Sequence, residues 1–95
     1  MSSVVEGAVA ALNAKLGGGF DGTAKFVIED EGAIMVDSDG ARAGDEEAEV
    51  TMSADAETFE AILSGDLNPT AAFMGGRLKV DGDMGMAMKL GGALS

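Results

Sequence analysis

The 95-residue sequence lacks cysteine, histidine, tryptophan and tyrosine, and each absence excludes a class of chemistry. Without cysteine there is no disulfide, no thiol nucleophile and no thiolate ligand for a metal. Without histidine the chain lacks the commonest general base, the Ser-His-Asp triad and the usual ligand of zinc and copper. We therefore expect a protein that is not an enzyme, with no catalytic residue, no metal and no cofactor.

Long apolar runs are also missing. No stretch of about 20 apolar residues that could span a membrane occurs, and no basic region of a signal peptide precedes the first apolar segment. A hydrophobic share of 46% is nevertheless high enough for a globular core. We expect one cytoplasmic domain covering residues 1–95.

Positive charge is scarce, with 6 Lys and Arg against 17 Asp and Glu, which gives a net charge of −11. Nucleic acid is therefore not an expected partner, because phosphate contacts need Lys and Arg. The charge is uneven along the chain. Three basic and fifteen acidic residues give residues 1–76 a net charge of −12, whereas three basic and two acidic residues give residues 77–95 a net charge of +1. Only this C-terminal part, with Arg77, Lys79 and Lys89, would not be repelled by an anionic headgroup or surface.

Helical spacing of apolar residues predicts a first helix over about residues 3–16. A Ser-x-x-Glu capping box at Ser3 and Glu6 begins it, and Gly17-Gly18-Gly19 ends it. Its apolar face has the i, i+3, i+4 pattern of an amphipathic helix: Val5, Ala8, Val9, Leu12 and Leu16.

Alternating apolar and polar residues predict strands at about 23–30, 33–37, 41–43, 48–53 and 77–81. The first two are joined by a tight turn and form a hairpin. Several strands connected by short turns indicate a mostly antiparallel sheet with one solvent-facing side.

Three further helices follow from their capping residues. Ser53 is the expected cap of the second, which Gly65 ends. Asn68 caps a short third helix over about 69–75, with Pro69 in its first position. Asp83 caps a final helix that begins at about Met84.

Acidic turns such as Asp37-Ser38-Asp39-Gly40 invite comparison with calcium loops. An EF-hand loop needs glycine at its sixth position and glutamate at its twelfth, but counting from Asp37 these positions hold Arg42 and Ala48. Turn formation explains these residues better, because Asp and Gly are standard turn formers.

Methionine is the residue that the chain has in abundance, with six besides Met1. Filling of an irregular core is the simpler explanation. The segment from Met84 onward, however, is apolar on all sides of a helix and is loosened by glycines. Such a terminal helix must be covered, must cover an apolar ligand, or must dimerise.

Residues 65–84, GDLNPTAAFMGGRLKVDGDM, resemble the sterol carrier protein 2 (SCP2) sterol-binding family. The family pattern is Ser-Gly-x-Leu-x-Pro, a short apolar helix, then Gly-Lys-Leu-Lys-(Val/Ile)-x-Gly-Asp-Met and a tail rich in Met and Leu. Here Ser64 opens the stretch and Arg77 replaces the usual lysine. The order of the upstream elements also matches, so the resemblance covers nearly the whole chain as a stand-alone member.

The resemblance implies an α+β fold, with a mostly antiparallel five-stranded sheet, helices packed on one face and an apolar tunnel between them. Family tunnels bind sterols, fatty acids, fatty acyl-CoA or phospholipids without catalysis; a single acyl chain suits this sequence best. By position, the resemblance implies a helical wall, a sheet side and a mobile C-terminal lid. The helical wall is Phe59, Leu63, Phe73 and Met74. The sheet side is Leu78 and Val80, and the lid is Met84, Met86, Met88 and Leu90.

Two functions stay open at this point. The first is binding or transfer of a lipid or other hydrophobic small molecule, gated by the Met-rich C-terminal helix, with transient contact to a membrane or an enzyme. The alternative is a structural or interaction module whose apolar tail serves self-packing or dimerisation without lipid binding. Either function is compatible with a monomer or a homodimer.

Overall fold

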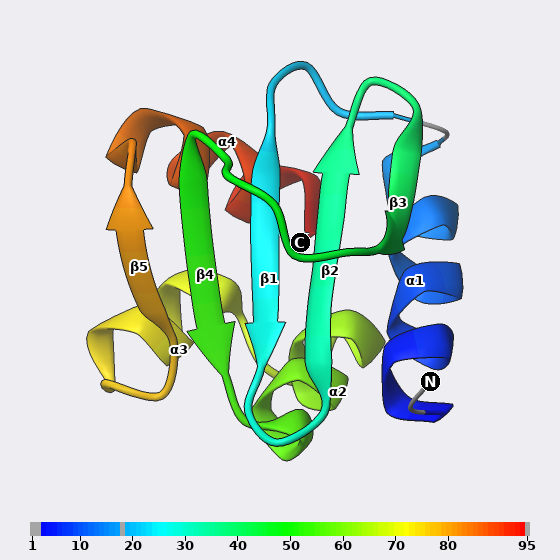
Figure 1. Cartoon of the computed structure of the whole chain (residues 1–95). Helices are drawn as coiled ribbons and strands as arrows, with labels where there is room; N and C mark the ends of the chain where they lie inside the picture. Colours follow the sequence, from blue (N-terminus) through cyan, green and yellow to red (C-terminus); the bar gives the residue numbers. More distant parts are fainter. Residues whose placement is uncertain (1–2, 18, 95) are drawn as a thin grey trace.

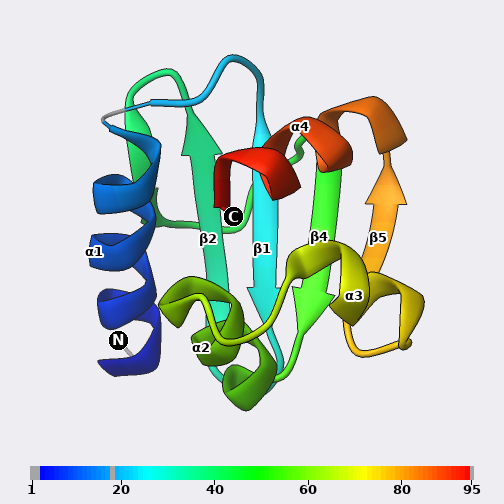
Figure 2. The same ribbon diagram turned by 180° about the vertical axis from the view of Figure 1, so that it is seen from behind.

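The computed structural model describes residues 3–17 and 19–94, which fold into one sheet with helices on one of its faces (Figures 1 and 2). The elements are α1 (Ser3–Leu16), β1 (Ala24–Ile28), β2 (Gly32–Asp37), β3 (Gly40–Ala43), β4 (Val50–Ala54), α2 (Ala56–Ser64), α3 (Pro69–Met74), β5 (Lys79–Gly82) and α4 (Met84–Leu94). The predicted α+β class is confirmed.

The five strands lie in the order β3-β2-β1-β4-β5. All neighbouring pairs are antiparallel except β1 and β4, which are parallel. The parallel pair arises because the chain leaves edge strand β3, crosses the outer face of the sheet and enters β4 on the other side of β1 (Figure 1). The sheet is therefore mixed but mostly antiparallel, as predicted.

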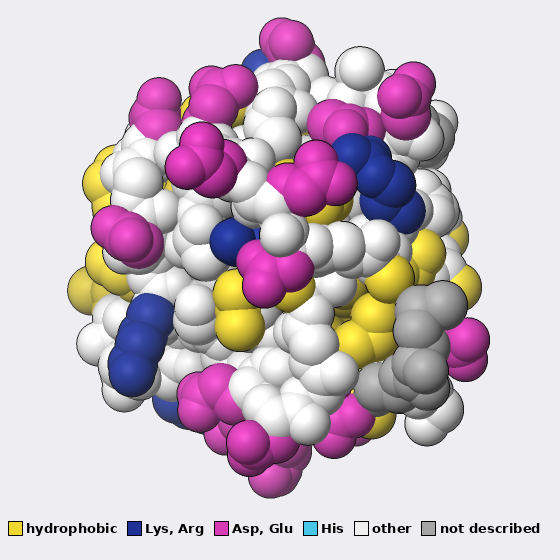
Figure 3. All heavy atoms as spheres, in the orientation of Figure 1, with side chains coloured by type: hydrophobic (Ala, Val, Ile, Leu, Met, Phe, Trp, Pro, Cys, Tyr) yellow, Lys and Arg dark blue, Asp and Glu magenta, His cyan; other side chains and the backbone are white. Residues whose placement is uncertain are grey.

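The outer face of the sheet is not fully exposed to solvent, although one solvent-facing side was predicted. Residues 44–49 run across it, and the backbone N–H of Glu46 donates to Sδ of Met35 at 3.4 Å. Met35 is consequently 1% exposed, and Asp45 pairs with Lys25 at 2.9 Å. Elsewhere this face carries scattered acidic side chains (Figure 3).

The main core lies between the inner face of the sheet and the helices. Strand alternation places Phe26 of β1 opposite Met52 of β4, with both side chains buried on the inner face. Phe59 of α2 packs edge-on against Phe26, with ring centroids 5.0 Å apart and an interplanar angle of 81°. This edge-to-face geometry is favourable for aromatic rings beyond the area that it buries.

Most predicted helix boundaries agree with the structure, but two predicted caps are wrong. Ser53 lies within β4, and Asp55 caps α2 by accepting a hydrogen bond from Thr58 N–H at 2.7 Å. Ser53 pairs with Lys79, and the strand continues through Ala54, so the helix begins too late for Ser53 to reach its first amides. Ser3 is the first residue of α1 rather than its cap, and the preceding residue lies outside the described residues.

The glycine and asparagine signals are confirmed. Gly65 ends α2 in the left-handed conformation, φ 87°, which glycine adopts without steric cost. Asn68 caps α3, accepting from Thr70 N–H at 2.8 Å. Asp83 accepts from the Gly85 and Met86 amides and so caps α4. Of the predicted Gly17-Gly18-Gly19 stop, Gly18 lies outside the described residues, and Gly17 has φ 65°.

We predict that Asp55→Ala lowers stability at pH 7 more than Asp55→Asn does, because Asn keeps the capping acceptor and loses only the contribution of the charge. Hydrogen bonds from the Thr58 side chain and backbone N–H hold the pKa of Asp55 below its ordinary 3.8. A depressed folded-state pKa stabilises the fold above pH 3.8, and the contribution is lost as the pH falls through the folded-state pKa. Urea unfolding between pH 7 and pH 2 measures the free energy of unfolding. The difference between wild type and Asp55→Ala should shrink as the pH falls, whereas the difference between Asp55→Asn and Asp55→Ala should not depend on pH. A constant wild-type advantage over Asp55→Ala at all pH values would contradict this assignment.

Candidate functional site

Among the described residues, four large hydrophobic side chains are exposed, and all four lie around one hollow. They are Phe73 at 41%, Met74 at 80%, Met84 at 46% and Met88 at 77% exposure. By contrast, Met52 on the inner face of the sheet is 3% exposed, and Met35 under the loop of residues 44–49 is 1% exposed. Core filling thus explains only part of the methionine content.

This hollow, the α3–α4 pocket, has a volume of about 300 Å³. Its floor comes from β4 and β5, and its walls come from α3 and α4. The lining residues are Met52, Pro69, Thr70, Phe73, Met74, Leu78, Val80, Met84, Ala87, Met88 and Gly91. Its volume is at the small end of the range of about 300–1,000 Å³ for small-molecule sites.

Local structure explains why these elements enclose an open space. The register pairs Met52 with Val80, so both side chains lie on the inner face beneath the pocket. α4 is held to the core by a helical stripe of buried residues, Ala87, Leu90, Gly91 and Leu94. The predicted helix that is apolar on all sides therefore has one buried side, and Met84 and Met88 remain beside the pocket.

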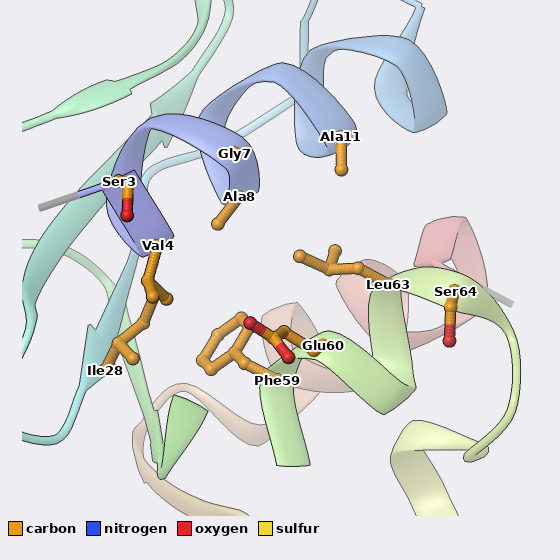
Figure 4. Close-up of a pocket in the computed structure, with 10 residues that line it drawn as sticks. All are labelled: Ser3, Val4, Gly7, Ala8, Ala11, Ile28, Phe59, Glu60, Leu63 and Ser64. Carbon is orange, nitrogen blue, oxygen red and sulfur yellow. The ribbon is translucent and has the colours of Figure 1, made fainter. Parts of the chain in front are cut away.

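A second hollow, the α1–α2 pocket, has a volume of about 310 Å³ (Figure 4). It lies between α1 and α2 at the end of β1. Its lining residues are Ser3, Val4, Gly7, Ala8, Ala11, Ile28, Phe59, Glu60, Leu63 and Ser64. The two pockets share no lining residue.

The predicted lining residues divide between the two pockets. Six line the α3–α4 pocket: Phe73, Met74, Leu78, Val80, Met84 and Met88. Phe59 and Leu63 line the α1–α2 pocket instead. Leu90 is fully buried on the core side of α4. Met86 packs beside Gly22, since a Cβ added to Gly22 would collide with Met86 Cε. These last two residues line neither pocket.

Aromatic and sulfur side chains lie between the two pockets. Phe59 lines the α1–α2 pocket and packs on Phe26, and Phe26 is the register partner of Met52 in the floor of the α3–α4 pocket. All three side chains are buried. The structure thus shows two open pockets on either side of these side chains, and a continuous tunnel stays a prediction.

Sequence reasoning missed five lining residues of the α3–α4 pocket: Met52, Pro69, Thr70, Ala87 and Gly91. A usable signal existed for two of them. Positions 84, 87, 88 and 91 have the i, i+3, i+4, i+7 spacing of one helix face. Ala87 and Gly91 could thus have been grouped with Met84 and Met88.

None of the three C-terminal cations lines the α3–α4 pocket. Arg77 donates to Thr58 Oγ1 at 3.2 Å. Lys89 pairs with Asp21 at 3.0 Å and lies 5.6 Å from the centroid of the Phe20 ring. Lys79 alternates with the inward Val80 and therefore lies on the outer side of β5. Thr70 contributes the one polar side chain among the pocket's lining residues.

No helix in the described part of the chain is long and apolar enough to cross a membrane.

Comparison with known proteins identifies relatives over nearly all of the chain. The model of the SCP-2 sterol transfer family matches residues 5–95. Hydroxysteroid dehydrogenase-like protein 2 of Danio rerio is 42% identical over 77 residues, which cover 73% of this chain and 19% of that protein. Human sterol carrier protein 2 is 44% identical over 46 residues, covering 48% of this chain and 8% of that protein. The chain spans about a fifth or less of these curated relatives.

Solved structures show the same fold. The NMR structure of sterol carrier protein-2 from Aedes aegypti in complex with palmitate has a TM-score of 0.78 at 19% identity, covering 100% of this chain and 97% of that chain. Palmitated SCP2L2 from Aedes aegypti has a TM-score of 0.75 at 20% identity, covering 99% and 95%. The five-stranded mixed sheet with four helices is therefore the fold of these proteins.

We predict that Leu90→Ala destabilises the fold by about 2–5 kcal/mol, the usual cost of truncating a buried leucine. Met88→Ala, on the exposed side of the same helix, should change stability by no more than about 0.5 kcal/mol. Urea unfolding at pH 7 measures both. Similar losses in the two variants would mean that Met88 is a core residue and that the pocket is not open.

Proposed function

The chain belongs to the SCP-2 sterol transfer family, and from this premise we propose that it binds a single-chain lipid in the α3–α4 pocket without catalysing a reaction. The observation that carries the proposal is the gathering of the exposed Phe73, Met74, Met84 and Met88 around one pocket. Leaving such side chains in water forgoes the hydrophobic stabilisation that their burial would bring. A ligand chain that covers them gains that stabilisation.

The lining chemistry favours a fatty acid or a related single-chain lipid. Each buried methylene contributes about 0.8 kcal/mol, so a long chain offsets the entropic cost of association and reaches micromolar affinity. A volume of about 300 Å³ suits one flexible chain better than a rigid sterol. The palmitate complexes of the two Aedes aegypti proteins support the same ligand class.

The headgroup of this ligand remains at the pocket mouth. No charged side chain lines the pocket, and Thr70 offers one hydroxyl. A buried carboxylate would lose its hydration without gaining an ionic partner. We therefore propose that a fatty acid and the corresponding fatty alcohol bind with similar affinity.

Ligand entry in this proposal uses the methionine side chains at the start of α4. Methionine is unbranched and adapts to irregular shapes, and Met84 and Met88 are exposed. Leu90 and Leu94 hold the second half of the helix in the core at 0% and 2% exposure. Gating therefore needs rotation of thioether side chains and loosening of the first turn, rather than departure of the whole helix.

A second candidate is an interaction module, favoured by one comparison. The dehydrogenase-like relative from Danio rerio is about five times longer than its matched part, so the matched region there is one part of a larger protein. In this alternative the exposed Met and Phe side chains would contact another protein surface. Palmitate titration separates the two, because only the carrier function requires saturable binding at one site per chain.

We predict that Gly91→Leu weakens palmitate binding at least tenfold, because the new side chain occupies the α3–α4 pocket. A Cβ on Gly91 meets only Pro69, at 3.8 Å, so the substitution has room. Gly92→Leu is the matched control, since a Cβ there meets no atom within 4 Å and Gly92 does not line the pocket. Calorimetric titration should show Gly92→Leu within twofold of wild type. Equal affinity of both variants would place the ligand elsewhere.

We also predict that hydrogen peroxide oxidises Met74 and Met88 before Met35 and Met52, because oxidation follows exposure. Each sulfoxide adds a polar group beside the pocket, so palmitate affinity should fall about tenfold. Peptide mass mapping gives the order of oxidation, and methionine sulfoxide reductases should restore binding. Bound palmitate should slow the oxidation of Met88. Full oxidation of both residues with unchanged affinity would contradict the assignment of the pocket.

A further inference from the structure

The α1–α2 pocket differs from the α3–α4 pocket in its polar groups. Glu60 is the one charged residue among its lining residues, and Ser3 and Ser64 add hydroxyls. The Glu60 side chain makes no hydrogen bond or ion pair within the part of the chain that the structure describes. In Figure 4 its side chain extends from α2 toward the first turn of α1. The pocket therefore offers an unpaired carboxylate beside an apolar floor.

The apolar floor is built from buried groups. Ile28 and Phe59 are each 1% exposed, and Leu63 extends from α2 toward α1 (Figure 4). The space above them exists because α1 carries small residues where it faces α2. A Cβ on Gly7 would meet no atom within 4 Å, so this part of the helix surface is unfilled.

The local charge disfavours anions. Glu6 in the first turn of α1 and Glu57 in the first turn of α2 are both exposed, and the whole chain has a net charge of −11. An anionic headgroup would be repelled here, whereas a cation would be attracted.

We propose that the α1–α2 pocket is a second site, which binds a single-chain amphiphile with a positively charged amine. Its hydrocarbon part contacts Ile28, Phe59 and Leu63, and its ammonium group pairs with Glu60. The buried Phe26 and Phe59 side chains lie between this site and the floor of the α3–α4 pocket. The amine site is therefore independent of the acyl-chain site proposed above.

The ion pair sets the selectivity, whereas the hydrocarbon part sets most of the affinity. Glu60 is exposed, and ion pairs at exposed positions contribute little because water and salt screen them. The preference for an amine over the uncharged alcohol of the same chain length should accordingly be about two- to fivefold. The preference over the carboxylate should be larger, because repulsion replaces attraction.

The experiment titrates the full chain with dodecylamine and dodecanoate below their micellar concentrations and with dodecanol below its solubility limit. Calorimetry measures the affinities, and amide chemical shifts in NMR spectra locate each ligand. The expected result is that dodecylamine shifts the amides of Gly7, Ala11 and Leu63 and binds more tightly than dodecanol. Dodecanoate should leave these amides unshifted.

Two pairs of variants test the site. Glu60→Gln should weaken dodecylamine binding about two- to fivefold and leave dodecanol unchanged. Glu57→Gln removes the same charge from the same helix outside the pocket, so it should weaken dodecylamine binding less than Glu60→Gln does and also leave dodecanol unchanged. Gly7→Leu should abolish amine binding and spare palmitate, and Gly92→Leu should affect neither ligand.

Equal weakening in Glu57→Gln and Glu60→Gln would overturn the proposal, because it would indicate general attraction to an acidic protein. Dodecylamine shifts confined to Phe73, Met84 and Met88 would also overturn it, by placing the amine in the α3–α4 pocket. If wild type does not bind palmitate, the proposed acyl-chain function is contradicted, but the proposed amine site is not affected.

Discussion

The edge-on contact between Phe26 and Phe59 holds the two layers of the fold together. Phe26 is on β1, the middle strand of the sheet, and Phe59 is on α2, the helix that follows β4. The chain has four phenylalanines and no other aromatic residue, so half of its aromatic rings are in this contact. It fixes α2 over the end of β1 and β2 nearest the turn that joins them, with α1 on one side and α3 on the other, while α4 crosses the opposite half of the sheet (Figure 2).

That arrangement leaves room for both pockets. The sheet is wider than the part of it that α2 covers, and the flanking helices meet α2 or each other through small or flexible side chains. α1 presents glycine and alanine to α2, and α4 presents methionine to the space beneath α3. Small residues leave space and methionines can move within it, so both pockets remain open without a break in the core.

Local chemistry made much of the fold predictable. Asn68-Pro69, Gly65 and Asp83 act within a few residues of the chain, and the structure uses them as their chemistry suggests. The parallel pairing of β1 with β4 was not predictable from alternation, because period-two patterns are the same for both pairings. The cap of α2 was predicted at the wrong residue because Ser53 belongs to β4, where it pairs with Lys79 of β5.

The site was predictable only in part, for a similar reason. Six expected lining residues meet in one pocket because they are close along the chain, between Phe73 and Met88. Phe59 and Leu63 belong to the other pocket, and this follows from a contact between residues 33 positions apart, Phe26 and Phe59. The methionines could not be sorted by composition either. Met35 is buried because a loop crosses the outer face, whereas Met88 is exposed because Leu90 occupies the core side of α4.

The most direct test of the account is NMR spectroscopy of protein labelled with ¹³C at the methionine methyl groups, titrated with palmitate. The account predicts saturable shifts of the Met74, Met84 and Met88 methyl signals at one palmitate per chain, while the signal of Met35 on the outer face stays in place. Signals that do not move, or that move only without saturation, would contradict the claim that these exposed thioethers form a lipid-binding site.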